Sequence, residues 1–331
     1  MNQGKWQLRD QLGRLGFGGT GVGNLYRAIS GEQAAATLEA AWDAGIRYFD
    51  TAPHYGLGLS ERRMGQVLAA KPREEFVVST KVGRVLVPSP ATKDARDPEG
   101  FDVPAEFRRE WDPSEAGARR SIEQSLERLG LEYIDIAYLH DPDVYSMEDV
   151  VKTALPALEK LRAEGLVRAI GVGTNTAGAA MECVEAADLD FLMLAGRFTM
   201  LEQPGSDGRP GAGLLDRCLE LGTGVVSVGV YNSGILAKPD LPSDAHYNYS
   251  QASEEILERA RLLARVCSEH GVELPTAAIQ FPFRHPAVVN VTVGASRPEQ
   301  ISNSAERMSA EVPRELWEDL QERGLIPARA A

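Results

Sequence analysis

Eight short apolar runs alternate with amphipathic segments along the whole chain, and this alternation constrains the fold more than any other feature. The runs are continuously hydrophobic, as expected for parallel strands covered on both faces. The segments between them have helical spacing, as in SGEQAAATLEAAWDAG, which begins at a capping Ser30 and ends at Gly45. The eight runs, in order, are RLGFGG, IRYFDT, EFVVSTKV, IDIAYLHD, VRAIGVGTN, DFLMLAGRF, GVVSVGVYN and AVVNVTVGAS.

An even series of eight strand–helix units predicts the α/β class and a single (β/α)8 TIM barrel, formed by residues 1–331 as one domain. An open, doubly wound sheet is the alternative, but no linker divides the chain, which favours closure. A C-terminal helix is expected in VPRELWEDLQERG. After the third strand, residues 87–111 are predicted to form one long irregular loop. Loops of that length are commonly lids or binding loops, and a tolerated surface insertion is the other interpretation.

The net charge of −13 argues against nucleic acid or an anionic membrane surface as the main partner. The N-terminal MNQGKWQLRDQ lacks the apolar core of a signal peptide, and no run approaches membrane-spanning length. We therefore expect a cytoplasmic protein that acts on a small molecule, as a monomer or a homodimer. Cys183, Cys218 and Cys267 lack metal-binding spacing and are expected to be reduced thiols in the core.

Polar side chains follow three consecutive strands of the predicted barrel. The second strand ends at Asp50, the third at Lys81 and the fourth at His140, while Tyr55 lies in the loop after the second. Reacting groups of such barrels come from the C-terminal ends of the strands. Alone, each residue has an ordinary explanation, such as a helix cap, a solvated lysine or a rim histidine. Their joint placement on adjacent strands predicts an active site.

This set of side chains suits proton transfer to or from an oxygen atom. A phenol with an ordinary pKa of about 10 is a poor base at neutral pH. The ammonium of Lys81 is expected to lower the pKa of Tyr55, and Asp50 to pair with Lys81 and keep it charged. His140 would hydrogen-bond the substrate oxygen, and His54 would only line the substrate site.

A metal-dependent barrel hydrolase is a second hypothesis, with Asp50, His54, His140 and Asp141 as ligands. The chain has five histidines and no His-x-His pair, so we expect no metal. Activity that withstands a chelator would exclude this class of enzyme.

The sequence resembles the aldo-keto reductase superfamily over essentially its whole length. YFDTAPHYG, SERRMGQVL, STKVG and LHDPD match motifs of that superfamily in order and spacing. The resemblance implies a catalytic tetrad of Asp50, Tyr55, Lys81 and His140, with Tyr55 as the general acid or base. It also implies a nicotinamide cofactor bound across the rim without a Gly-rich Rossmann fingerprint. Because some relatives of the superfamily are not enzymes, a nicotinamide-sensing subunit is the alternative.

The resemblance further implies cofactor contacts at the ends of the later strands. These are Thr174, Asn175, Arg197, Ser233, Gly234, Leu236, Gly294, Ser296, Arg297, Gln300 and Asn303. Backbone amides in YNSGIL would bind the pyrophosphate, and Arg197 would replace a glutamine that the family commonly has near the nicotinamide. Many members strict for NADP(H) carry Lys where Gly294 stands and Arg where Gln300 stands. Arg297 and Ser296 could still bind a 2′-phosphate, so NAD(H) and NADP(H) both stay open, with a slight lean to NADP(H).

Three further segments, KVGRVLVP, LAGRFTMLEQ and YNSGIL, resemble a narrower branch of L-fucose and D-threo-aldose 1-dehydrogenases and pyridoxal 4-dehydrogenase. This resemblance implies hydride transfer between the nicotinamide and a sugar or sugar-like aldehyde or hemiacetal. EFRREW supplies Arg108, Arg109 and Trp111, which could stack on a sugar ring and hydrogen-bond it. At least one of these arginines is expected on a solvated face.

Overall fold

A closed barrel of eight parallel strands forms the centre of the computed structural model, which describes residues 3–203, 213–238, 246–247 and 250–327. The strands are β1 (Leu15–Gly18), β2 (Tyr48–Asp50), β3 (Val77–Val82), β6 (Ile134–His140), β7 (Val167–Thr174), β8 (Phe191–Ala195), β9 (Gly224–Val228) and β12 (Val288–Gly294). They follow one another around the barrel in the order β1, β12, β9, β8, β7, β6, β3, β2, and β2 pairs with β1 to close it. The predicted TIM barrel is therefore confirmed, and the open sheet is excluded.

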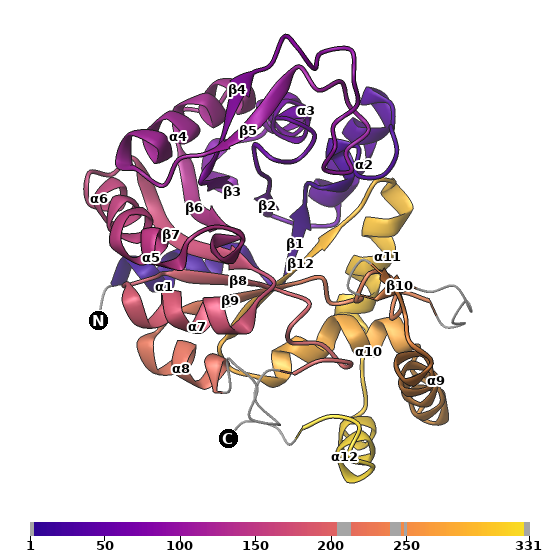
Figure 1. The fold of residues 1–331 in the computed structure, drawn as a ribbon. Helices are drawn as coiled ribbons and strands as arrows, with labels where there is room; N and C mark the ends of the chain where they lie inside the picture. Colours follow the sequence, from indigo (N-terminus) through magenta and orange to yellow (C-terminus); the bar gives the residue numbers. More distant parts are fainter. Residues whose placement is uncertain (1–2, 204–212, 239–245, 248–249, 328–331) are drawn as a thin grey trace.

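Helices cover the outside of the barrel, and Figure 1 shows most of them as a ring around the strands. The longer helices are α2 (Gly31–Asp43), α3 (Leu59–Leu68), α4 (Glu115–Leu129), α6 (Leu155–Ala163), α7 (Ala177–Ala186), α8 (Leu214–Leu221), α9 (Glu254–Glu269), α10 (Leu274–Gln280), α11 (Pro298–Ser309) and α12 (Arg314–Glu322). The hydroxyl of Ser30 caps α2 by accepting from the amide of Gln33 at 3.1 Å, and Gly45 follows the helix with a left-handed φ of 81°. Both predicted boundaries of this helix are thus confirmed.

Short elements complete the connections between these helices and strands. They are the helical turns η1 (Gly21–Gly23), η2 (Arg73–Glu75), η3 (Pro142–Val144), α5 (Met147–Asp149), η4 (Val150–Ala154) and η5 (Phe281–Arg284), and the paired strands β10 (His246–Tyr247) and β11 (Ser250–Gln251). The predicted C-terminal helix is α12.

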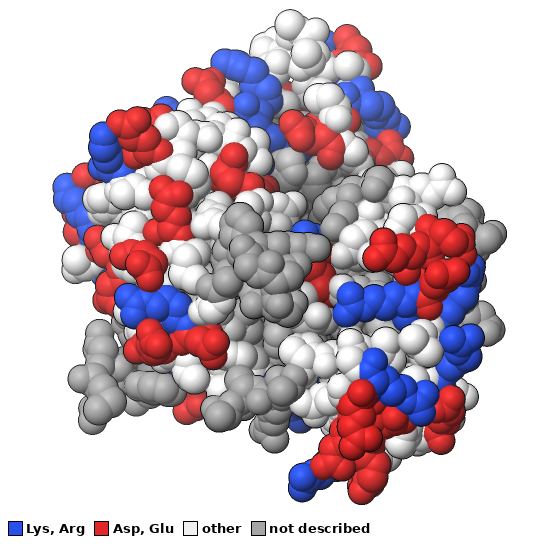
Figure 2. Space-filling view, turned by 60° about the horizontal axis from the view of Figure 1, so that its bottom comes forward, with Lys and Arg blue, Asp and Glu red and all other residues white. Residues whose placement is uncertain are grey.

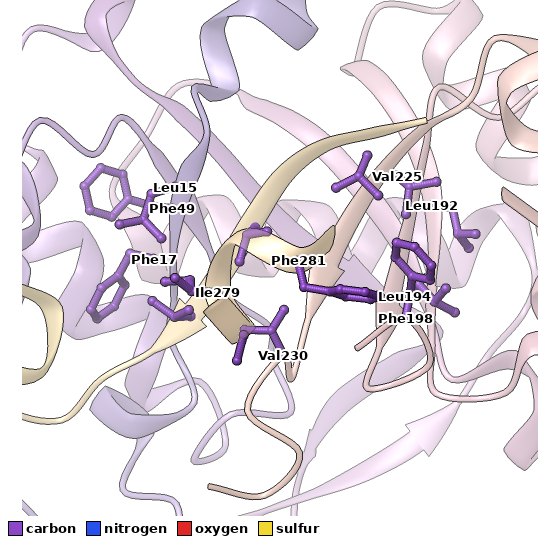
Figure 3. Packing of buried hydrophobic residues seen from close by; sticks show 14 of the residues in the cluster. Leu15, Phe17, Phe49, Leu192, Leu194, Phe198, Val225, Val230, Ile279 and Phe281 are labelled. Carbon is purple, nitrogen blue, oxygen red and sulfur yellow. The ribbon is translucent and has the colours of Figure 1, made fainter. Parts of the chain in front are cut away.

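The main apolar core lies between the strands and the surrounding helices, and Figure 3 shows part of it. Phe17 of β1 and Phe49 of β2 are fully buried, and Phe281 packs on Phe198 with ring centroids 5.2 Å apart. Burial of each such side chain contributes about 1.5–3 kcal/mol. Phe17 and Phe49 face outward from their strands. Because side chains alternate along a strand, the residues next to them in β1 and β2 point into the barrel.

The helix α1 (Gln3–Leu12) closes the N-terminal end of the barrel. Its Leu8 and Leu12 are buried in an interior cluster with Tyr48, Ile136 and Phe191. This helix was not expected from the sequence, since it lies outside the strand–helix alternation. Because packing closes this end, a ligand can enter the barrel only from the C-terminal ends of the strands.

The segment that follows β3 is more regular than the predicted loop. Its two ends, β4 (Arg84–Pro88) and β5 (Phe107–Trp111), pair as an antiparallel hairpin. The prediction of an irregular stretch over residues 87–111 is wrong at both ends. There β4 and β5 form backbone hydrogen bonds with each other and do not join the barrel. We call residues 84–111 the insertion. A bridge between Leu25 and Phe101 holds its middle against the loop after β1, and Figure 1 shows the hairpin at the edge of the barrel near α4.

Acidic and basic side chains are intermingled over the face of the molecule that Figure 2 shows. The three cysteines are unpaired and buried, as the sequence predicted, and burial raises the pKa of each thiol to about 12. Within the described residues, no helix combines the length and the apolar character that crossing a bilayer requires.

Candidate active site

Three adjacent strands direct polar side chains into the C-terminal end of the barrel. Tyr48 packs inside the barrel, so Asp50, two residues further along β2, points inward as well. Lys81 of β3 lies opposite Tyr138 of β6, whose ring is also interior, and His140 follows Tyr138 by two residues. Strand pairing therefore brings a carboxylate, an ammonium and an imidazole to one place.

Lys81 and Asp50 form a buried ion pair, with side chains only 2% and 4% exposed. The Nζ atom of Lys81 donates to Oδ1 and Oδ2 of Asp50 at 2.8 and 2.6 Å and to the carbonyl oxygen of Thr51 at 3.0 Å. The hydroxyl of Ser79 donates to Oδ1 of Asp50 at 2.6 Å. Burial acts to lower the pKa of Lys81, but Asp50 and Tyr55 outweigh it and the net shift is upward. Lys81 therefore stays an ammonium at neutral pH.

Tyr55 lies over this ion pair. Its ring centroid is 4.8 Å from Nζ of Lys81 and 5.9 Å from the ring of His140, which it meets edge-on. Burial raises the pKa of Tyr55 to about 12, although Lys81 acts in the opposite direction. Lys81 thus acts to lower this pKa, as expected, but the effect of burial exceeds that of the ammonium and the net shift is upward. Tyr55 is therefore a protonated phenol at neutral pH.

His140 and His54 face one another beside Tyr55, with ring centroids 5.4 Å apart. Burial lowers the pKa of both imidazoles, that of His54 to about 2 and that of His140 well below its ordinary value, and neighbouring cations add to the effect. Both rings are therefore neutral at neutral pH, and each can donate one hydrogen bond. A neutral imidazole at this place can hold an uncharged substrate oxygen.

A cavity of about 540 Å³ opens above these side chains. Asp50, Tyr55, Lys81 and His140 line it. Residues with little or no side chain also line it, namely Gly18, Gly173, Ala195, Gly229 and Gly294, together with Thr174, Asn175, Met193, Val228 and Thr292. Where glycines line a cavity, a flat ring can lie against the backbone. The residues present thus fit a nicotinamide ring beside Tyr55.

Of the residues predicted to bind the cofactor, some line a cavity and others do not. Thr174, Asn175 and Gly294 line the main cavity, and Gly294, Ser296 and Gln300 line an adjoining hollow of about 180 Å³. The remaining predicted residues line neither space; they are Arg197, Ser233, Gly234, Leu236, Arg297 and Asn303.

These remaining residues differ in their surroundings. The guanidinium of Arg197 binds Glu202 at 2.7 Å, so the suggested replacement of a glutamine by Arg197 finds no support. Leu236 is fully buried, while Ser233 and Gly234 are exposed in the turn after β9. The amides of Gly234 and Leu236 both donate to the carbonyl oxygen of Tyr231, at 2.9 and 3.1 Å, so both are engaged within the turn.

None of the three residues predicted to bind a sugar from EFRREW lines the cavity. Arg109 is buried and binds both carboxylate oxygens of Asp97 at 2.6 and 2.7 Å, and the carbonyl oxygen of His54 at 2.8 Å. Trp111 stacks on Tyr145. Arg108 is exposed beside Glu110, as expected for one of the arginines. Arg109 and Trp111 lie on the same face of β5, and their side chains contact Asp97 and Tyr145, outside the cavity lining.

Several residues that line the cavity were not proposed from the sequence. Glu99 and Phe101 come from the middle of the insertion, Tyr26 from the loop after β1, and Arg84 from the start of β4. Only Arg84 had a usable signal, since it directly follows STKVG. The others lie in irregular segments, where periodicity does not report direction.

The contacts of two of the four suggested metal ligands argue against the metal-dependent hydrolase. The carboxylate of Asp50 binds the Lys81 ammonium at 2.6 Å, and that of Asp141 binds Arg84 at 2.9 Å. These cations occupy the oxygens that a metal would need. Across the part of the chain that the structure describes, no group of three or more His, Cys, Asp or Glu side chains is arranged to hold a metal ion.

The closed barrel, with Asp50, Tyr55, Lys81 and His140 at one end, has the architecture of an aldo-keto reductase. Residues 14–323 match the Aldo/keto reductase family, so the chain belongs to that family. It is an oxidoreductase enzyme, which corrects the alternative of a non-catalytic nicotinamide-sensing subunit.

Two curated relatives span nearly the whole chain. A D-threo-aldose 1-dehydrogenase of Pseudomonas sp is 50% identical over 319 residues, which cover 95% of this chain and 94% of the relative. A pyridoxal 4-dehydrogenase of Microbacterium luteolum is 38% identical over 329 residues, which cover 94% of each. Among solved structures, an aldo-keto reductase from Bacillus halodurans matches with a TM-score of 0.71 at 25% identity, covering 93% of this chain and 91% of that one.

Proposed function

We propose that this enzyme transfers hydride between a nicotinamide cofactor and the anomeric carbon of an aldose, oxidising the ring hemiacetal to a lactone, and that it reduces sugar aldehydes at the same site. The observation that carries the proposal is the phenol of Tyr55, which lies beside the Lys81–Asp50 pair and His140 and lines a cavity that Gly18, Gly173, Gly229 and Gly294 also line. The relative that is 50% identical is a D-threo-aldose 1-dehydrogenase, which supports an aldose as the substrate.

In this mechanism Tyr55 moves the proton. The cofactor, when bound, supplies or accepts the hydride. In reduction the phenol donates its proton to the substrate oxygen, and in oxidation the phenolate accepts the proton of the anomeric hydroxyl. Lys81 stabilises the phenolate because it remains charged beside it, and Asp50 holds Lys81 in place. Neutral His140 hydrogen-bonds the substrate oxygen and keeps it directed at Tyr55.

A spectrophotometric screen tests the proposal by following the absorbance of the reduced nicotinamide. Neutral aldoses and simple aldehydes are supplied with NAD(H) and with NADP(H), in both directions. We expect oxidation of at least one aldose, with one lactone formed per reduced cofactor. Absence of turnover with every aldose and both cofactors would contradict the proposal. We further propose that the enzyme works in the cytoplasm, as a monomer or a homodimer, and its three unpaired cysteines are consistent with a reducing compartment.

Oxidation and reduction should depend differently on pH. Because the pKa of Tyr55 is raised to about 12, the phenolate fraction increases about tenfold per pH unit below that value. We therefore expect kcat/KM for oxidation to rise from about pH 7 to about pH 10, and kcat/KM for reduction to stay level over that range. Steady-state profiles in both directions provide the measurement. A reduction rate that already declines near neutral pH would mean that another group donates the proton.

The contacts of Gln300 support NAD(H), rather than NADP(H), as the favoured cofactor. The Oε1 atom of Gln300 accepts from the amides of Ser296 and Arg297 at 2.9 and 3.1 Å, at the start of α11. Free amides at a helix start are the groups that bind a phosphate. Since these two are occupied, we propose the reverse of the slight lean to NADP(H) that the sequence suggested.

Replacing Gln300 with arginine should therefore increase the affinity for NADP(H). Gln300→Arg frees the two amides and adds a cation, and charge-assisted hydrogen bonds contribute about 1.5–3 kcal/mol each. We expect the ratio of the Kd values for NADPH and NADH to fall at least about tenfold. Fluorescence titration measures both values. Gln321→Arg on α12 controls for the added charge, and an unchanged ratio in Gln300→Arg would reject the assignment.

A further inference from the structure

An ion pair between Arg84 and Asp141 lines the cavity beside the tetrad, and the proton-transfer scheme uses neither residue. The Nη1 atom of Arg84 donates to Oδ2 of Asp141 at 2.9 Å. Arg84 follows Lys81 by three residues, and Asp141 directly follows His140. Because β3 and β6 are paired, the ion pair continues their ladder past the ends of the strands. It therefore lies where a substrate held at Tyr55 would extend.

Aromatic side chains hold Arg84 in position from behind. Gly83 has a φ of 103°, and a Cβ at that position would clash with the ring of Trp111. Trp111 stacks on Tyr145 with ring centroids 3.9 Å apart and planes 7° apart, and the Tyr145 ring lies 5.8 Å from Cζ of Arg84. The side chain of Arg84 is only 10% exposed. Arg84 is thus a fixed element of the wall and not a mobile surface cation.

Asp141 is held in an unusual backbone conformation that turns its carboxylate toward the cavity. Its φ is 44°, in the left-handed region that non-glycine residues rarely adopt. The amide of Asp141 donates to the carbonyl oxygen of Gly173 at 2.8 Å, which ties this conformation to β7. Oδ2 of Asp141 also lies 3.5 Å from Nε2 of His140. Strained residues of this kind persist chiefly at functional sites, where the surrounding structure enforces them.

We propose that the Arg84–Asp141 pair binds two adjacent hydroxyl groups of a ring-closed sugar and selects such sugars over simple aldehydes. The proposal rests on the proposed function, since it assigns the part of the substrate that the tetrad does not touch. A guanidinium only donates hydrogen bonds and a carboxylate only accepts them. Each hydroxyl of a vicinal diol does both, so one diol satisfies the two side chains together.

Charge favours a neutral sugar over an anionic substrate at this position. Arg84 and Asp141 neutralise one another, and Glu99 lines the same cavity. A substrate carboxylate or phosphate would meet two carboxylates for one guanidinium. Phe101 and Tyr26 also line the cavity, and aromatic rings suit the apolar face of a sugar ring. The lining therefore matches a neutral cyclic polyol.

The test compares a neutral aldose with propanal, which has no hydroxyl groups. Arg84→Lys keeps the charge but loses the planar fork, and Asp141→Asn keeps the shape but loses the charge. We expect each variant to lose at least about tenfold more kcat/KM for the aldose than for propanal, mainly through KM. Arg108→Lys on the exposed face of β5 is the matched control and should leave both values unchanged.

Inhibition of propanal reduction by a methyl glycoside gives a second measurement that needs no sugar turnover. The glycoside has the ring hydroxyls but no anomeric hydroxyl to oxidise. We expect competitive inhibition of the wild type and at least a tenfold higher inhibition constant in Arg84→Lys. Circular dichroism establishes whether each variant is folded. If either Arg84→Lys or Asp141→Asn is not, the other one is used for both measurements.

Several outcomes would overturn the proposal. Equal losses for the aldose and propanal would mean that the pair only positions His140. A wild type that favours a uronic acid or an aldehyde phosphate, with the loss falling on that substrate, would mean that Arg84 binds an anion. If the wild type reduces propanal but oxidises no aldose, the proposed function itself fails. Failure of the proposed function is measured on the wild type alone. Failure of the proposed binding of hydroxyl groups by Arg84 and Asp141 is measured by comparing the variants with the wild type.

Discussion

Replacing Tyr55 with phenylalanine should lower kcat about 10²- to 10⁴-fold in both directions, while the Kd of the cofactor stays unchanged. The change removes one oxygen atom from a ring that otherwise stays in place against His140 and Phe101. In reduction no phenol would be left to donate the proton, and in oxidation no phenolate would be left to accept it. Single-turnover kinetics with an aldose and fluorescence titration of the reduced cofactor measure the two quantities separately.

Tyr133→Phe provides the matched control for the loss of a phenol. Tyr133 lies just before β6, and the guanidinium of Arg73 packs over its ring 3.7 Å from the centroid, far along the strand from His140. This variant should keep the activity of the wild type. If Tyr55→Phe also kept full turnover, the proton would have to come from another group, and the role proposed for Tyr55 would be abandoned.

The barrel and the strand-end residues could be predicted because both follow from local patterns. Runs that are apolar on both faces mark strands covered by helices, and eight of them leave few alternatives to a closed barrel. The last residues of neighbouring strands must then share one rim. Asp50, Lys81 and His140 were placed by that argument, and the structure joins the first two at 2.6 Å. The role of Ser30 as the N-cap of α2 could be predicted in the same way, because a helix cap depends only on neighbouring residues.

Features that depend on distant packing could not be predicted in the same way. The pKa of Tyr55 is set by how deeply the phenol is buried, and its ring packs beside residues distant in sequence, such as Phe101 of the insertion and His140 of β6. Arg109 was expected at the substrate because nothing in the sequence marks Asp97, twelve residues earlier in an irregular stretch, as its partner. The hairpin was missed for a related reason: FRREW is charged, and strands that pair only with each other lack the apolar signal of a barrel strand.

The pairing of Lys81 with Asp50 was expected from the sequence. Its effect on stability follows only from the burial of both side chains in the structure. Lys81→Met should destabilise the protein by about 3–5 kcal/mol at neutral pH, because the carboxylate of Asp50 is left buried without a cation. Activity should fall as well, since Tyr55 loses the charge that stabilises its phenolate. Urea unfolding and kcat for aldose oxidation provide the two measurements.

The direction of the pH dependence distinguishes this cause from simple loss of packing. Without Lys81, burial holds the pKa of Asp50 above its unfolded value of about 3.9. The variant should then be closest to the wild type in stability at acidic pH and lose stability as pH rises through that value toward the raised pKa. The double variant Asp50→Asn/Lys81→Met has no charge at these two positions, so it should recover most of the lost stability and show no such slope, yet remain inactive. Equal destabilisation of the single and double variants at all pH values would mean that the lysine contributes through packing, and that its charge does not account for the stability of the site.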